Sequence, residues 1–290
     1  MELVHQQTNN PELTAQEMVC TNVLVAVVEA LNRGACKLTV HADGDVKTDL
    51  GGWADDTDIP VFTSSTIRSA PAPAWEVARV LGEVPATCIH PLVIYALSLL
   101  ERQALLGNTS LQELLLVRHK LDSESLQPLC DALVLNQTLQ HLHLGQNRLG
   151  DCHGLAQSLG SLSCGLCELH LTRCGISPRG VAAIAVALTT NRTLRELHIG
   201  NNRAGDAGAE AMARSLQQNR TLAVLGLASN GVGNAGAVAL ADAISSHNRS
   251  LVKLELQSNE IGAKGTARLA QALCENTTLR SFTMQVRAKL

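Results

Sequence analysis

The chain has 290 residues, of which 46% are hydrophobic and 17% are charged, and its formal net charge is −3. This balance excludes a disordered chain, and it provides no basic field that would favour nucleic acid or an anionic membrane surface. Only 2% of the residues are aromatic. Leu, Ala, Val and Gly must therefore fill the core, which suits thin repeated layers better than one thick centre.

The cysteines and the N-terminal sequence bear on the compartment. The nine cysteines are an odd number without the spacing of a disulfide framework, which indicates a reducing environment. The first residues, MELVHQQTNNPE, carry neither a secretory signal nor a mitochondrial presequence. The most apolar stretch, 89–100, is too short to span a bilayer. We therefore expect a cytoplasmic protein with no membrane partner.

Residues 1–107 are expected to form an N-terminal cap region. Residues 14–33 have the pattern of a capped helix, and residues 35–43 imitate the repeat strand described below, as a degenerate repeat would. Residues 42–74 join an acidic stretch to a Pro/Ala-rich run and are predicted to be a loop insertion, with a short strand near 59–62. Trp53 in this insertion either contacts a partner or packs onto the repeats, and the rarity of exposed Trp favours packing. A helix over 92–106 is expected to cover the first edge of the repeat stack.

Residues 108–290 carry a phased repeat. The pattern Leu-x-x-Leu-x-Leu/Ile recurs every 27 to 29 residues, beginning at Leu111, Leu139, Leu166, Leu194, Leu222, Leu251 and Leu279. The position eight residues after the start holds Asn147, Asn202, Asn230 and Asn259 in four units, and Cys174 in a fifth. Each unit is typical of a short strand with inward leucines, followed by a Gly turn and an amphipathic helix. Because no unit can bury its leucines alone, the units are expected to stack.

These repeats resemble the ribonuclease-inhibitor type of leucine-rich repeat, which also occurs at the C-terminus of NOD-like receptors. The resemblance covers residues 108–287. It implies an α/β solenoid, or horseshoe, with a parallel sheet on the concave face and helices on the convex face. About seven strand units are expected, the last without its helix. The resemblance also implies protein binding, although members of that family bind many different proteins.

Six Asn-x-Ser/Thr triplets accompany the repeat, at Asn108, Asn136, Asn191, Asn219, Asn248 and Asn276. Each would be a glycosylation acceptor if read alone. Every one lies three residues before the first leucine of a repeat, however. We therefore interpret these asparagines as shaping the turn from helix to strand.

The C-terminal end is predicted to leave an open sheet edge, because the chain stops soon after the strand that begins at Leu279. The basic residues Arg280, Arg287 and Lys289 are one way to discourage pairing there. Alternatively, the edge docks a partner or a second copy of the chain, which would make it a site of self-association.

Outward-facing strand residues are expected to form columns on the concave face. The predicted central column contains His143, His170, His198 and Glu255. We expect His141, Glu168 and Glu196 to flank it on one side and Arg195 on the other, with Arg173 beyond a strand end. These residues form the densest polar constellation of the sequence and are the predicted partner-binding site.

Three interpretations of the stacked histidines compete: a metal site, a pH-sensitive contact patch, and a solvent-exposed sheet face that contacts a protein. Flat columns seldom converge on one tetrahedral point, so we expect no metal and no other cofactor. A single CxxC, Cys164 to Cys167, is too weak a pattern for a zinc or redox site. A protein-binding face is the favoured interpretation.

No signature of an enzyme is present, since GxxxxGK[ST], GxSxG and HExxH are all absent. The sequence thus predicts no catalytic residue, and it favours a non-enzymatic interaction module or scaffold that binds a protein. One alternative is a regulator of a small GTPase, as GTPase-activating proteins with a similar repeat are. Those proteins carry an acidic tail, which this basic C-terminus does not match. A second alternative is an architectural subunit of a cytoskeletal or ciliary assembly.

Overall fold

The computed structural model describes residues 37–40, 46–49 and 111–285. Its strands form one sheet in the order β2-β1-β3-β4-β5-β6-β7-β8-β9. Their bounds are β1 (Lys37–Val40), β2 (Val46–Asp49), β3 (Glu113–Leu115), β4 (His141–His143), β5 (Glu168–His170), β6 (Glu196–His198), β7 (Val224–Gly226), β8 (Lys253–Glu255) and β9 (Ser281–Thr283). Only β1 and β2 pair antiparallel, and every other neighbouring pair is parallel.

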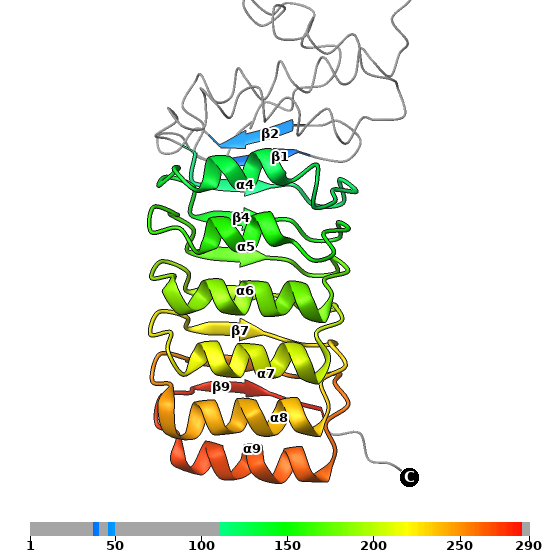
Figure 1. Cartoon of the computed structure of the whole chain (residues 1–290), viewed down its shortest axis with the longest axis vertical. Helices are drawn as coiled ribbons and strands as arrows, with labels where there is room; N and C mark the ends of the chain where they lie inside the picture. Colours follow the sequence, from blue (N-terminus) through cyan, green and yellow to red (C-terminus); the bar gives the residue numbers. More distant parts are fainter. Residues whose placement is uncertain (1–36, 41–45, 50–110, 286–290) are drawn as a thin grey trace, which may run out of the picture.

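A helix follows each strand from β3 to β8. The helices are α4 (Gln127–Leu133), α5 (His153–Leu159), α6 (Pro178–Thr190), α7 (Gly205–Leu216), α8 (Asn234–Asp242), continued by the π-helix η5 (Ala243–His247), and α9 (Ala263–Glu275). All of them lie in one layer over the same face of the sheet, each unit stacked on the one before (Figure 1). This arrangement confirms the predicted α/β solenoid of parallel strands and helices.

The leucines of the repeat make up the core between the two layers. In the second unit Leu139, Leu142 and Leu144 are all fully buried, and the same positions are buried in the units on either side. Burying one leucine side chain contributes about 1.5–3 kcal/mol, so the repeated triplets are the main source of stability. Glycine brings neighbouring helices close together: a Cβ on Gly236 would lie 2.7 Å from the Cβ of Ala209.

The asparagines after the strands bind consecutive units together. Asn202 is the clearest case: its Oδ1 accepts hydrogen bonds from the backbone N–H groups of Cys174 and Ile176, both at 3.0 Å. Its Nδ2 donates to the carbonyls of Leu171 and Ile199, both at 2.8 Å. Cys174 occupies the same position in the preceding unit, where its Sγ lies 3.0 Å from the carbonyl of Leu144 and donates to it. The predicted equivalence of Cys and Asn at this position is confirmed.

The asparagines of the Asn-x-Ser/Thr triplets form a second ladder. Asn219 is fully buried; its Oδ1 accepts from the N–H groups of Thr221 and Leu222, and its Nδ2 donates to the carbonyl of Leu188 in the preceding unit. The same pattern recurs at Asn191, Asn248 and Asn276. These amides are already used inside the turns, which confirms their structural role.

Two units depart from the 28-residue length, and the structure shows how the longer one is accommodated. The unit from Leu222 to Leu251 has one extra residue. It is absorbed by η5, where the N–H of Asn248 donates to the carbonyl of Ala243 five residues earlier. The unit that begins at Leu139 is one residue short. The strands of both units still pair in register with their neighbours.

At the N-terminal end of the sheet, β1 continues the parallel stack. Leu38 lies beside Leu114 of β3, so the degenerate motif at 35–43 supplies a strand in the position that the repeat predicts. The prediction of a loop over the whole of 42–74 is wrong at Val46–Asp49, which forms β2 against β1. The helices expected at 14–33 and 92–106, the strand near 59–62 and Trp53 lie outside the described residues.

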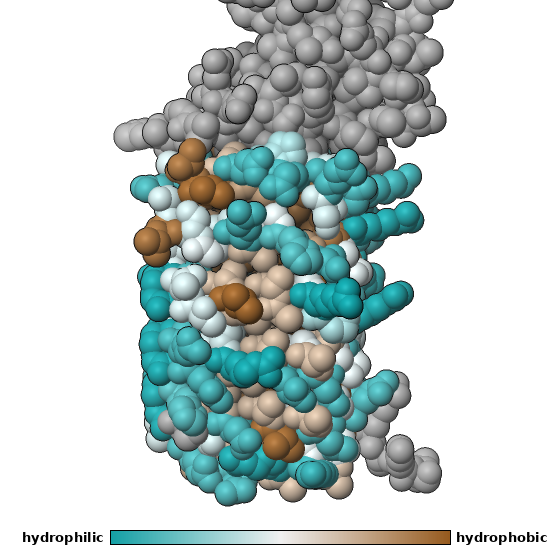
Figure 2. Space-filling model, viewed as in Figure 1, coloured by the Kyte–Doolittle hydropathy of each residue, from teal (hydrophilic) through white to brown (hydrophobic). Residues whose placement is uncertain are grey.

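The remaining surfaces are the helix face and the C-terminal edge. Figure 2 shows the helix face, where hydrophobic residues form a strip between hydrophilic margins. Val186 of α6 is an exposed apolar residue of the helix layer, and Leu135 and Leu162, which are also exposed, follow α4 and α5 along the chain. Within the described part of the chain, β9 is the last strand of the sheet and no helix follows it. No helix of that part is both long enough and apolar enough to cross a bilayer.

Candidate binding face on the parallel sheet

The face of the sheet turned away from the helices carries the predicted columns. Each strand from β4 to β6 has three residues, and the central leucine is fully buried beneath the sheet. Side chains alternate along a strand, so the first and third residues point to the opposite face. The pairing register aligns His143 with His170 and His170 with His198, which confirms the central column.

The three imidazoles of this column, which we call the histidine stack, lie in parallel layers. The ring centroids of His143 and His170 are 4.2 Å apart with an interplanar angle of 12°, and those of His170 and His198 are 4.3 Å apart at 10°. Between 20% and 28% of each of these side chains is exposed. Offset or parallel stacking of this kind is favourable and fixes the ring orientation. Hence the stack is an ordered, half-buried feature.

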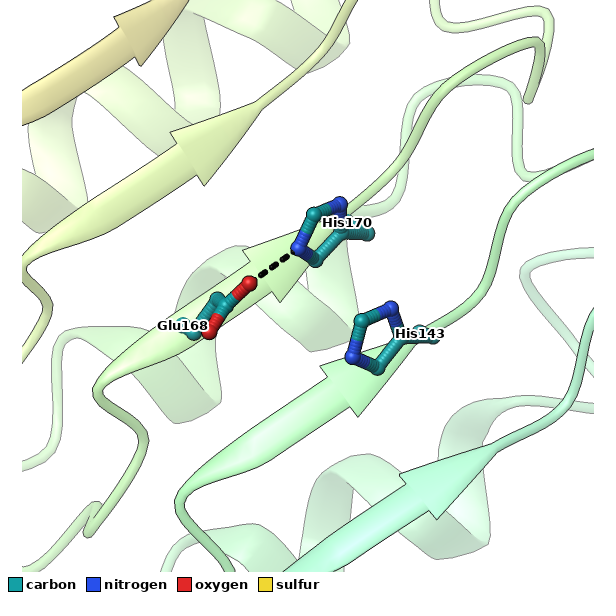
Figure 3. A group of neighbouring side chains, drawn as sticks. All are labelled: His143, Glu168 and His170. Carbon is teal, nitrogen blue, oxygen red and sulfur yellow. Dashed lines mark hydrogen bonds and ion pairs between the residues drawn. The ribbon is translucent and has the colours of Figure 1, made fainter. Parts of the chain in front are cut away.

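A row of carboxylates, Glu113, Glu168 and Glu196, runs beside the stack. Nε2 of His170 donates a hydrogen bond to Oε1 of Glu168 (Figure 3). Nε2 of His143 lies 3.7 Å from Oε1 of Glu113, and Nε2 of His198 lies 3.4 Å from Oε2 of Glu196. All three rings therefore turn the same edge toward the carboxylate row.

Glu168 is the centre of this network. Its second oxygen, Oε2, accepts a hydrogen bond from Nδ1 of His141 at 2.9 Å, so one carboxylate joins two histidines. Although burial alone would raise the pKa of Glu168, hydrogen bonds from His170 and His141 and their positive charge lower it to about 2. The carboxylate consequently stays ionised at neutral pH.

His143 has the opposite environment. Burial, and then repulsion from His170, lowers the pKa of His143 below its ordinary value, against the opposing attraction of Glu113. Its imidazole is therefore neutral at pH 7. The stack can present a nitrogen lone pair, which neutral imidazole has and imidazolium lacks.

The column continues differently toward the C-terminus. Gly226 takes the position after His198, and a Cβ there would lie 3.1 Å from Oε2 of Glu255 and 3.2 Å from Nδ1 of His198. The missing side chain thus lets Glu255 and His198 approach the same point. Glu255 also pairs with Lys253, with Nζ and Oε1 2.7 Å apart, and this contact raises the pKa of Lys253.

The two predicted arginines lie at the margin of the face. Arg195 precedes β6 by one residue and is exposed, and its backbone bonds to the equivalent residues Cys167 and Ala223 of the neighbouring units. Arg173 is exposed beyond the end of β5, as expected, in a left-handed turn with φ 59°. In the part of the chain that the structure describes, neither side chain bonds to the histidine stack. The sequence reasoning missed Glu113, which the register places beside His141.

Three buried cysteines of the repeats have raised thiol pKa values. Among the described residues all six cysteines are free. Burial raises the pKa of Cys164, and it raises that of Cys152 to about 12 and that of Cys174 to about 11. Since the thiolate is the reactive and ligating form, these three thiols are inert.

Comparison with known protein families supports the assignment of the repeat as leucine-rich. The model of the TMOD/LMOD leucine-rich domain matches residues 175–289, and a general leucine-rich-repeat model matches residues 135–151. No curated protein matched the chain. Together with the phased sequence and the stacked units, the family-model matches identify a leucine-rich-repeat domain.

Two solved structures are similar to the chain. One is described as leiomodin-1 actin-binding site 2; it is 25% identical, and the match covers 46% of this chain and 78% of that chain, with a TM-score of 0.42. The other is the C-terminal domain of tropomodulin from Caenorhabditis elegans; it is 15% identical, and the match covers 63% of this chain and 92% of that chain, with a TM-score of 0.43.

Proposed function

We propose that this chain is a non-enzymatic protein-binding module whose sheet face, centred on the histidine stack, receives a protein partner. The observation that carries the proposal is the ordered polar surface over β4 to β6. There a continuous set of half-buried ionisable side chains lies on a fully buried leucine layer. Solenoids use extended surfaces of this kind to bind proteins.

The geometry favours binding because the side chains are already ordered. Stacking and the hydrogen bonds of Glu168 hold the histidines in one arrangement before a partner arrives. Immobilising a flexible side chain on association costs about 0.5–1.5 kcal/mol, and an ordered face avoids much of that cost. The carboxylate row next to the stack favours a partner surface that carries basic groups.

The experiment compares partner capture by three forms of the full chain. One is the wild type, the second combines His143→Ala, His170→Ala and His198→Ala, and the third is His153→Ala as a control. His153 is the exposed first residue of α5, on the helix layer. Affinity purification with mass spectrometry identifies proteins that the wild type and the control retain and the triple variant loses.

Affinity for the partner so identified is then measured directly. The triple variant should bind at least about tenfold more weakly, since residues that matter at an interface cost more than about 1 kcal/mol when truncated. Its circular dichroism should match that of the wild type, because the altered side chains lie on the surface. Unchanged affinity in a folded triple variant would show that the partner binds elsewhere.

A cytoskeletal partner is the second candidate. It is supported by the TMOD/LMOD match over residues 175–289, which includes β6 to β9. Actin is the ligand named for the leiomodin-1 segment, so co-sedimentation with actin filaments is the first test. A chain that stays in the supernatant at every filament concentration would exclude actin filaments and leave the broader proposal of protein binding standing. The ribonuclease-inhibitor type of repeat and a cytoplasmic location remain predictions.

A further inference from the structure

The histidine stack offers donor atoms that protein binding does not require. One nitrogen each from His143 and His170 and one oxygen from Glu168 all lie within 4.8 Å of one another. Figure 3 shows the two rings one above the other, with the Glu168 carboxylate at the same edge. The Nε2 edges of both rings face the carboxylate row, that of His170 toward Glu168 and that of His143 toward Glu113.

We propose that His143, His170 and Glu168 form a binding site for a divalent transition-metal ion of the zinc class, with the remaining coordination position open to solvent. Two imidazoles and one carboxylate are a ligand set typical of open zinc sites, where a water or another ligand completes the tetrahedron. The ion would take the place of the Nε2 proton through which His170 bonds to Glu168. That proton would pass to solvent from a charged ring, or to Nδ1 in a neutral one, so that the bound ring is neutral with its proton on Nδ1.

Binding requires the two stacked rings to turn toward each other. Zinc lies about 2.0–2.2 Å from nitrogen and oxygen ligands, so two ligand atoms of one tetrahedron are roughly 3.4 Å apart. The donor atoms lie within 4.8 Å, but the rings are stacked at 4.2 Å with an interplanar angle of 12°, so at least one imidazole must rotate out of the stack until both ring planes contain the ion. Two strands suffice, since Glu168 and His170 share β5 and His143 is the register neighbour of His170.

The surroundings favour a cation. Among the described residues, the ion pairs of Glu168 and Glu196 are all with histidines. In the described ranges no Lys or Arg forms an ion pair with either carboxylate, so no permanently charged side chain competes with a bound ion for them.

His141 has the position of a supporting residue. Its Nδ1 donates to the Glu168 oxygen that does not bond to His170, and so it orients the carboxylate. Partners of this kind tune metal affinity without touching the ion. This predicts a graded effect: removing a ligand abolishes the site, and removing His141 weakens it.

A neighbouring group of possible metal ligands must be distinguished from this site. Glu168 also belongs to a second group of possible ligands, with Glu196 and His198. Because the two groups share Glu168, they are distinguished by their histidines and by Glu196. The stacked pair is preferred since it contributes two imidazoles, the commonest zinc ligands, whereas the second group contributes one.

The test is a calorimetric titration of the chelator-treated, reduced full chain with ZnCl₂. The wild type should bind one Zn²⁺ ion per chain. His143→Ala and His170→Ala should each bind none, whereas His153→Ala should bind as the wild type does. His141→Ala should weaken binding by about 10- to 100-fold. Circular dichroism checks that each variant is folded. A wild-type chain that takes up no zinc would overturn the proposal, and so would folded His143→Ala and His170→Ala variants that take up as much zinc as the wild type.

Substitution with Co²⁺ separates this site from cysteine ligation. Coordination by imidazole and carboxylate gives visible bands that depend on His170, without the near-ultraviolet band of a cobalt–thiolate bond. A thiolate band that accounts for all of the bound cobalt would overturn the assignment. Loss of the visible bands on His198→Ala together with their persistence on His143→Ala would also overturn it, by moving the ion to the second triad. Partner capture without added metal measures the proposed protein binding separately, so either proposal can fail alone.

Discussion

Replacing Asn202 by Ala tests whether the asparagine ladder holds the repeats together. The side chain is 8% exposed and makes four hydrogen bonds of 3.0 Å or shorter, two as acceptor and two as donor. The bonds to Cys174, Ile176 and Leu171 reach the preceding unit, so the substitution loosens a junction between units. Ala cannot replace any of them.

The expected loss follows from the number of bonds. A typical intramolecular hydrogen bond contributes about 1 kcal/mol net, which gives about 4 kcal/mol for the four bonds of Asn202. Water entering the vacated space offsets part of this loss, so we expect the free energy of unfolding to fall by about 3 kcal/mol. Against a total stability of about 5–15 kcal/mol for a folded domain, this is a large fraction.

The assay is urea unfolding followed by far-ultraviolet circular dichroism. Gln218→Ala is the control, because Gln218 is exposed at the C-terminal end of the same unit and its loss should change stability by no more than about 0.5 kcal/mol. Asn202→Asp keeps the acceptor oxygen and removes the two donors, so it should be destabilised as well. A loss below about 1 kcal/mol for Asn202→Ala, with an unchanged denaturant slope, would refute the ladder as a source of stability.

Three further predictions concern packing and pH. Gly180→Ala should lower the free energy of unfolding by about 1–3 kcal/mol in the same assay, since the new Cβ would lie 2.8 Å from the backbone oxygen of Gly150; a neutral effect would contradict the tight packing. His170→Ala should raise the pKa of His143 in an NMR titration, because it removes both burial and a repelling charge; no change would contradict these causes. Glu168 has a folded-state pKa of about 2 against an ordinary 4.5, so its stabilising contribution is complete above pH 4.5 and is lost as the pH falls toward 2. Acid unfolding should therefore depend less on pH over this range in Glu168→Gln than in the wild type, and equal dependence would contradict the network.

The sequence alone determined the fold and the histidine stack. Leucines at fixed spacing must be buried, and a repeat of constant phase places equivalent residues in register on adjacent strands. His143, His170 and His198 hold the same position in consecutive units, so their alignment in one column followed from counting. The burial of the Asn-x-Ser/Thr amides followed from the same phase.

Only the tertiary structure decided how these side chains face one another. Ring orientation, the Glu168 contacts to both His141 and His170, and the approach of Glu113 to His143 depend on rotamers and on distances between strands, which no spacing in the sequence encodes. The strand β2 was missed although Asp43 and Gly44 form a hairpin signal, because antiparallel pairing lies outside the repeat pattern. The phase of the repeat thus determines which residues lie on the sheet face, and side-chain packing determines which contacts they make with one another.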